Sequence, residues 1–247
     1  MGRMFPMAVL IAGLALAGCA TRSAAPGPSA SPSPADLPPD WVQSEAMWQA
    51  LAAGDAQPRS AQWLLTSPDR ASHLDGRQTS NLRLPIFRSA TDVYVVVLQG
   101  HFRPQEGQVA SASSLYVVLS RRHSYLAHGS TSANIDLAGL GRLHSYVPRL
   151  PVQAGVWGHT MSAGGLFPGP CPIADVKVAV WKGDDVAATG KPLMKVRSDA
   201  DGFFSLDLAP GVYSLKLADS DHGYPTTETV TVEAGKPVAA GVYGTMK

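Results

Sequence analysis

Residues 198–217 read Ser-Asp-Ala-Asp-Gly-Phe-Phe-Ser-Leu-Asp-Leu-Ala-Pro-Gly-Val-Tyr-Ser-Leu-Lys-Leu. Large apolar side chains alternate with polar ones on both sides of the Ala-Pro-Gly turn, which is the period of a strand with one buried face. The Asp-Ala-Asp-Gly cluster that precedes the first run is typical of a tight turn, because Asp and Gly suit its backbone. The stretch therefore predicts two consecutive β-strands joined by a short turn.

The same alternation continues on both sides of this stretch. Before this stretch, Val176, Val178 and Val180 alternate with smaller or polar residues. After it, Val230 and Val232 show the same alternation. Strands of this length, separated by turn clusters every 8–12 residues, are typical of a sandwich. We expect a seven-stranded antiparallel β-sandwich over residues 152–247.

These residues also resemble a known family. The Asp-Gly turn at 201–202, the Pro-Gly turn at 210–211 and the tyrosine at 213 are similar to the core motif of carboxypeptidase regulatory-like (prealbumin-like) domains. Residues 155–158 and 172–181 resemble the first hairpin of that family. The resemblance implies a β-sandwich and carries almost no information about function.

Residues 41–151 combine helical and strand patterns, and their first helix is expected from Trp41 to Ala53. Asp40 lies three residues before Gln43, a spacing that predicts an N-cap and a capping box. Periodicity places Trp41, Trp48, Leu51 and Ala52 on one helical face. A second short helix is expected from Ser67-Pro68 to Asp75-Gly76.

The strands of residues 41–151 are predicted from their apolar runs. Residues 93–98 are continuously apolar and favour a buried central strand, and a further strand is expected at 60–66. Residues 115–119 and 125–128 predict a hairpin. With both helices packed on one face of this sheet, the result is a small α+β domain. The overall fold class is thus mainly β with an α+β N-terminal part.

A boundary between the two parts is expected near Pro151. Residues 1–151 contain twelve arginines and no lysine, whereas residues 152–247 contain all seven lysines and one arginine. The contrast has no evident physical cause, but it separates two regions of the chain.

Residues 1–18 have the pattern of a lipoprotein signal peptide. Arg3 precedes an uncharged run from 5 to 18, which is too short for a spanning helix and suits a signal peptide. The run ends in Leu16-Ala17-Gly18-Cys19, which resembles the lipobox of bacterial lipoproteins. The resemblance implies that Cys19 carries lipid and becomes the first residue of the mature chain. The alternative is an ordinary secretory signal that is cleaved nearby.

Residues 19–40 predict a disordered tether behind the lipidated cysteine. Between 20 and 40 the chain has six prolines and four serines, with Leu37 as its one large apolar side chain. Such a segment cannot bury enough apolar surface to offset the loss of conformational entropy. Through Cys19 the chain would attach to the lipid bilayer on the extracytoplasmic face of the cell membrane.

Charge and motifs exclude several classes of function. A net charge of +1 disfavours a nucleic-acid partner, because such proteins need a local excess of basic residues. The His-x-x-Glu motif of zinc carboxypeptidases is missing, and no His-x-His pair occurs, so we expect neither a metal nor another cofactor. No catalytic motif was identified, and the chain is not expected to be an enzyme.

Three residues of the second part remain as candidates for function. Trp181 and Phe203 fall on the outward phase of their strands, where flat rings could stack on sugars. The alternative is that these rings cover a neighbouring strand or the first part. Cys171 has no intramolecular partner if Cys19 is lipidated, and it is a candidate free thiol. It is either buried and inert or an exposed thiol that can cross-link two chains. We expect a non-catalytic binding or spacer module that meets a cell-envelope protein or glycan. The alternatives are a carbohydrate-binding surface protein, and an enzyme with an unrecognised site in 41–151.

Overall fold

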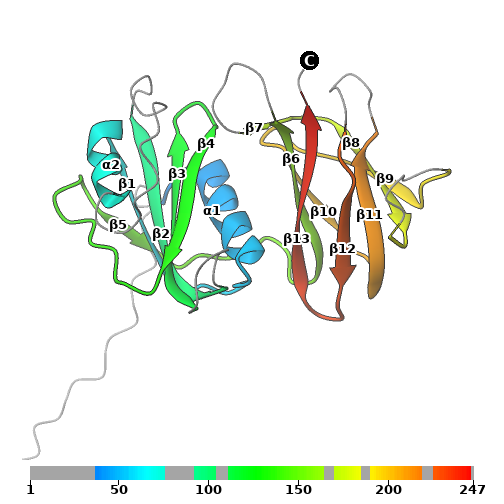
Figure 1. The fold of residues 1–247 in the computed structure, drawn as a ribbon, viewed down its shortest axis with the longest axis horizontal. Coiled ribbons are helices and arrows are strands. Elements are labelled where there is room, and N and C mark those ends of the chain that lie inside the picture. The colour runs from blue at the N-terminus through cyan, green and yellow to red at the C-terminus, as the bar shows by residue number, and fades with distance from the viewer. Residues whose placement is uncertain are drawn as a thin grey trace, which may run out of the picture. The chain divides into compact units, whose positions relative to one another are not determined.

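The computed structural model describes residues 37–75, 92–103, 111–163, 170–184, 190–218 and 225–245, all within one compact unit (Figure 1). This range contains two helices and thirteen strands, which confirms the mainly β fold class. The signal segment, Cys19 and most of the expected tether lie outside the described residues. The first helix begins at Asp40, directly after two prolines.

A five-stranded antiparallel sheet forms the first part, in the order β4-β3-β2-β1-β5. In chain order, the elements of the first part are α1 (Asp40–Ala52), β1 (Ser60–Thr66), α2 (Pro68–Asp75), β2 (Val93–Phe102), β3 (Ala112–Ser120), β4 (Tyr125–Thr131) and β5 (His144–Tyr146). The predicted strand at 60–66, the hairpin of β3 and β4 and the central position of β2 are all confirmed.

The two helices lie on opposite faces of this sheet, so the prediction that both cover one face is wrong. Val96 and Leu98 of β2 belong to the apolar cluster that contains α1. Val95 and Val97 belong to another cluster, which contains Ala71 of α2. Since successive side chains of a strand point to opposite faces, a strand that is apolar throughout needs a cover on each side.

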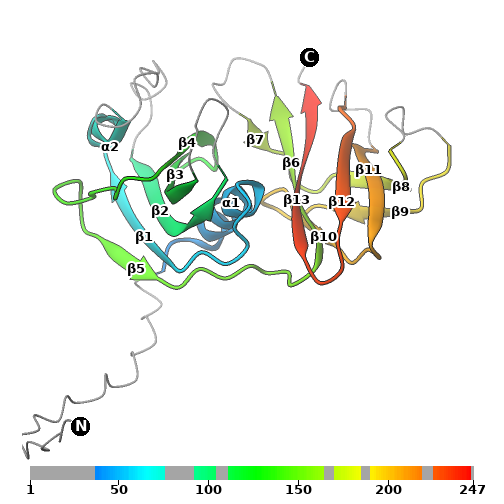
Figure 2. The same cartoon turned by 60° about the horizontal axis from the view of Figure 1, so that its bottom comes forward.

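Helix α1 is buried on more than one side. Seven consecutive residues, 45–51, are buried, and the helix contacts β2 and β3 as well as β6 and β13 of the second part (Figure 2). The predicted cap is not formed: Pro39 precedes the helix, and the Gln43 side chain donates to the Pro38 carbonyl instead. Ala52, expected on the buried face, is exposed.

Two four-stranded sheets form the second part, one in the order β10-β6-β13 with β7 beside β6, the other in the order β12-β11-β8-β9. The strands are β6 (Gly155–Ala163), β7 (Cys171–Pro172), β8 (Lys177–Lys182), β9 (Met194–Arg197), β10 (Phe203–Leu206), β11 (Gly211–Leu217), β12 (Glu228–Val232) and β13 (Pro237–Thr245). Their inward side chains form one apolar core between the sheets. Gly158 lets the Phe204 ring approach β6, because a Cβ there would lie 1.9 Å from that ring.

The sandwich differs in two details from the predicted seven antiparallel strands. It has eight strands in the described residues, because a two-residue strand, β7, pairs with the end of β6. In addition, β13 runs parallel to β6 along its whole length. Parallel neighbours need a long connection, and here the six strands between them provide it. Alternation along each strand predicts burial but not the direction of its neighbour.

Candidate functional site

A buried carboxylate and a buried imidazole meet where α1 packs on β6. Glu45 Oε2 lies 3.1 Å from His159 Nδ1, and the two side chains are 5% and 2% exposed. The other carboxylate oxygen of Glu45 accepts a hydrogen bond of 2.9 Å from Gln49. The orientation of the imidazole does not meet hydrogen-bond geometry, so both ring nitrogens of His159 lack a hydrogen-bond partner among the described residues.

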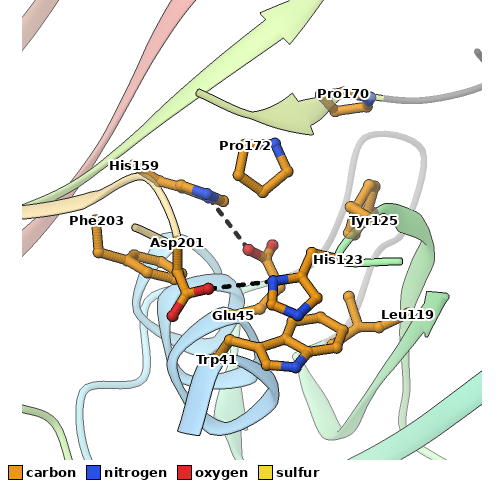
Figure 3. A pocket seen from close by; sticks show the side chains of 10 residues that line it. All are labelled: Trp41, Glu45, Leu119, His123, Tyr125, His159, Pro170, Pro172, Asp201 and Phe203. Atoms are coloured by element: carbon orange, nitrogen blue, oxygen red, sulfur yellow. Dashed lines mark hydrogen bonds and ion pairs between the residues drawn. The ribbon is translucent and has the colours of Figure 1, made fainter. Parts of the chain in front are cut away.

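A second histidine–carboxylate pair joins the first part to the sandwich, but here the first part contributes the histidine and the sandwich contributes the carboxylate. His123, in the turn between β3 and β4, has its Nδ1 3.1 Å from Asp201 Oδ1, in the turn before β10. The imidazole of His123 stacks on Trp41 of α1, with ring centroids 4.2 Å apart. In Figure 3 both pairs face one small space, and Trp41 lies against His123. We call Glu45, His159, His123 and Asp201 the junction cluster.

The space at the junction cluster is too small for a ligand. Phe203 stacks on His159 with centroids 4.2 Å apart, and the Trp48 ring meets the same imidazole edge-on at 5.7 Å. These rings leave a cavity of about 10 Å³, which is about the space that one water molecule occupies. The junction cluster can exchange a proton or hold a water, but it does not admit a substrate.

An open groove of about 460 Å³ lies beside the small cavity at the junction cluster, and Tyr125 and Pro170 line both. Its walls come from the C-terminal half of α1, the end of β2, and strands β4, β6 and β13. We name it the α1–β4–β13 groove; the residues that matter below are Trp48, Arg103, Tyr125, His128 and Tyr243. Its volume falls in the range of small-molecule sites.

Besides the Gln49 amide, which donates to Glu45, the polar groups of the described lining are the Arg103 guanidinium and neutral rings. Burial, and more weakly the charges of Glu228 and Glu45, raise the pKa of Tyr243, so its hydroxyl stays protonated. Partial burial lowers the pKa of His128 against a smaller opposing effect of Glu45. The imidazole of His128 is therefore neutral at pH 7, and its Nδ1 is hydrogen-bonded to the Tyr125 hydroxyl.

A second groove, of about 510 Å³, lies where Val152 and Trp157 meet β10. Its charged groups already have partners. Arg197 pairs with Asp175 at 3.0 Å, and the Asp199 carboxylate accepts the backbone N–H groups of Asp201 and Phe203. Fewer charged side chains of this groove are therefore available to bind a polar ligand than in the α1–β4–β13 groove.

The structure does not bring the two predicted ring residues together. Phe203 lies on β10 and Trp181 on β8, in different sheets. Phe203 is 6% exposed and packs on the α1 side of the sandwich, so the prediction that it presents an exposed ring is wrong. The alternation correctly predicted that the Phe203 ring points away from the core of the sandwich. That face of the sheet is nevertheless buried, because α1 covers it. Trp181 is half-buried, and its Nε1 donates to the Gly190 carbonyl at 3.3 Å.

Cys171 is half-buried on β7 and forms no disulfide with a described residue. Its Sγ lies 3.7 Å from Ser124 Oγ, in the turn between β3 and β4. The thiol thus also lies where the two parts meet. Cys19, the expected lipidation site, is outside the described residues.

Glu45 and His159 were not predicted from the sequence. One signal was available, because Trp157 and Met161 flank His159 at the outward phase of β6. Large apolar side chains on that phase indicate that something covers the outer face of the sheet. Nothing in the sequence identifies Glu45 as the partner of His159.

The described residues contain neither a metal-binding cluster nor a membrane-spanning helix. No group of three or more His, Cys, Asp and Glu side chains is arranged to hold a metal ion within these ranges. Over the same ranges, neither helix has the length and apolar character needed to cross a membrane.

Comparisons with known proteins give little further information. No family model and no curated protein matches the chain. A solved structure described as "The Bacillus anthracis TIE protein" matches at 8% identity, with a TM-score of 0.29. The match covers 76% of this chain and 52% of the other, so the chain spans about half of that structure's length.

Proposed function

We propose that the chain is a membrane-anchored extracytoplasmic lipoprotein whose folded unit binds a ligand in the α1–β4–β13 groove. The sequence from Arg3 to Cys19 supports the anchor, and the proline-rich segment behind it supports a tether. One observation carries the binding role. A groove of about 460 Å³ combines half-buried aromatic rings with an exposed guanidinium, that of Arg103.

The junction cluster supports this binding role more than a catalytic one. Glu45 and His159 could exchange a proton, but the cavity beside them has room for about one water. A reacting group of a substrate must come within hydrogen-bond reach of its acid or base. The pair instead holds α1, one wall of the groove, against β6, another wall.

A carbohydrate-binding surface at Trp181 is a second candidate, supported by one observation. Val212 is 38% exposed, and it shares a face with Ser214, the direct neighbour of Trp181 on β11. A half-buried aromatic ring near an exposed apolar side chain can stack on a sugar. A glycan array that retains its binding pattern with the Trp181→Ala variant would exclude this surface.

The groove is tested by blocking it at an exposed position. Ala52 lines the groove and is exposed at the end of α1, so Ala52→Trp should fill the space without disturbing the core. Ala138→Trp, on an exposed turn outside the groove, is the matched control. Full-length protein is solubilised from its native envelope, and the small molecules and glycans that copurify are identified by mass spectrometry. We expect a species that copurifies with the wild type and the control but not with Ala52→Trp. Identical sets for all three proteins would contradict binding in the groove.

A further inference from the structure

Arg103 is held at the rim of the groove with its side chain exposed. Its backbone N–H donates to the Ala53 carbonyl at 2.7 Å, which fixes the residue beside the end of α1. Its side chain lies across Gly54, where a Cβ would come within 2.6 Å of Nε, so the glycine leaves room for the guanidinium. The side chain is exposed and forms no ion pair with a described residue.

Trp48 adds an aromatic ring to the lining of the groove. Trp48 lines the groove and is 7% exposed, and its indole N–H has no hydrogen-bond partner among the described residues. This N–H is shielded from the groove, so Trp48 contributes its ring and not a hydrogen-bond donor to the lining.

The charged group that the described lining itself carries is the Arg103 guanidinium, although the carboxylates of Glu45 and Glu228 act on Tyr243 from outside the lining. Tyr243 stays protonated and can donate from its hydroxyl. None of the described lining residues is acidic. The groove therefore combines a guanidinium and a phenol hydroxyl, with no acidic side chain among its described lining residues.

We infer that the α1–β4–β13 groove binds a carboxylate carried on a ring or short chain of small-molecule size, with Arg103 as the residue that pairs with the carboxylate. The inference rests on the proposed function and names the ligand class of that site. The planar guanidinium matches a carboxylate with two parallel hydrogen bonds. The rings of Tyr125 and Tyr243 cover the body of the ligand. A sugar acid and the C-terminus of a short peptide both present this chemistry.

The experiment uses calorimetric titration of the full-length protein in detergent micelles. The probes are digalacturonate and acetyl-dialanine, each compared with its neutral partner, the methyl ester or the amide. A hydrogen bond to a charged group contributes about 1.5–3 kcal/mol, so at least one acid should bind about tenfold or more tightly than its neutral partner. Arg103→Gln should remove this preference and Arg103→Lys should weaken it. Arg197→Gln, which changes an arginine outside this groove, should leave it intact.

The outcomes separate this inference from the proposed function. If an acid and its neutral partner bind equally, the carboxylate assignment is wrong while binding in the groove stands. If Arg103→Gln lowers only the melting temperature, Arg103 serves the C-terminal end of α1 and the inference is overturned. If neither acid binds, the inference also fails, and the Ala52→Trp comparison still decides the proposed function. Which of the two acids binds identifies the source of the carboxylate.

Discussion

Glu45 Oε2 of α1 and His159 Nδ1 of β6 lie 3.1 Å apart, although 114 residues separate them in the chain. This contact brings the first sheet and the sandwich together through one helix. Because α1 covers the outward side chains of β6 and β10, it turns the outer face of that sheet into a buried surface. The same helix forms one wall of the open groove, so the buried pair supports the shape of the proposed site.

Replacing Glu45 by Ala should destabilise the folded unit strongly. The change removes the acceptor of the Gln49 hydrogen bond and the carboxylate beside the His159 imidazole, and each buried polar group left without a partner costs about 1–3 kcal/mol. Glu45→Gln, which keeps the shape of the side chain, should cost less. Equilibrium unfolding in urea measures both changes.

His123→Ala provides the matched control for that measurement, because the His123–Asp201 pair is exposed to water. An exposed ion pair contributes about 0–1 kcal/mol, to which the lost stacking of His123 on Trp41 adds a modest amount. Equal losses of stability in Glu45→Ala and His123→Ala would show that the buried pair contributes no more to the free energy of unfolding than the exposed pair.

Tyr146→Phe should leave the stability at pH 7 unchanged or raise it. The Tyr146 hydroxyl is buried and has no hydrogen-bond partner among the described residues. Removing an unsatisfied buried hydroxyl is close to neutral or favourable. In Tyr213→Phe, by contrast, the 2.9 Å bond to the Ala209 carbonyl is lost, and the cost should be about 1 kcal/mol. Thermal unfolding of the two variants beside the wild type makes the comparison.

Tyr146 should also make the stability depend on pH in alkaline solution. Burial raises the pKa of Tyr146 well above its ordinary value. As pH rises past about 10, the unfolded chain loses the phenol proton while the folded chain keeps it. The stability contributed by this group is complete below about pH 10 and falls as the pH rises further. Tyr146→Phe should flatten this decline, and an unchanged slope of stability between pH 9 and 11 would contradict the assignment.

Phe203→Ala should lower the free energy of unfolding and should not remove an exposed glycan-binding ring. The ring is buried against His159 and Trp157, and truncating a buried Phe typically costs about 3–5 kcal/mol. Trp181→Ala should cost less, because that ring is half-buried. The two unfolding curves test this order. Similar, small losses from both variants would mean that α1 does not cover Phe203 in solution.

Cys171 should react with a maleimide in the folded protein, but slowly. The thiol is half-buried on β7, so a reagent can reach it without unfolding the sandwich. Intact mass after labelling, with and without urea, measures the fraction modified. A thiol that stays unlabelled until urea is added would exclude a cross-linking role for Cys171.

Alternation and turn chemistry predicted much of this fold. The strands around 203–206, 211–217 and 228–232 follow directly from period-two patterns and Asp-Gly or Pro-Gly turns. The same patterns could not show what covers an outward face. Phe203 was placed outward correctly and is nevertheless buried, because the covering helix is more than 150 residues away in the chain.

Helix α1 shows the limit of periodicity for a helix. A helix with one buried face has a clear stripe of apolar residues, but α1 is packed between two sheets and has buried residues at consecutive positions. Its pattern therefore identified a helix and not its partners. The pairing of Glu45 with His159 and the groove beside it depend on this packing and could not be predicted from the sequence.

The mature N-terminus tests the central claim, a lipid-anchored extracytoplasmic protein, most directly. Top-down mass spectrometry of the membrane-extracted protein should find a chain that begins at Cys19 and carries the mass of thioether-linked diacylglycerol. The Cys19→Ser variant should lose that mass and move from the membrane fraction to the soluble fraction. A wild-type chain with an unmodified N-terminus, or one found entirely in the soluble fraction, would contradict the account.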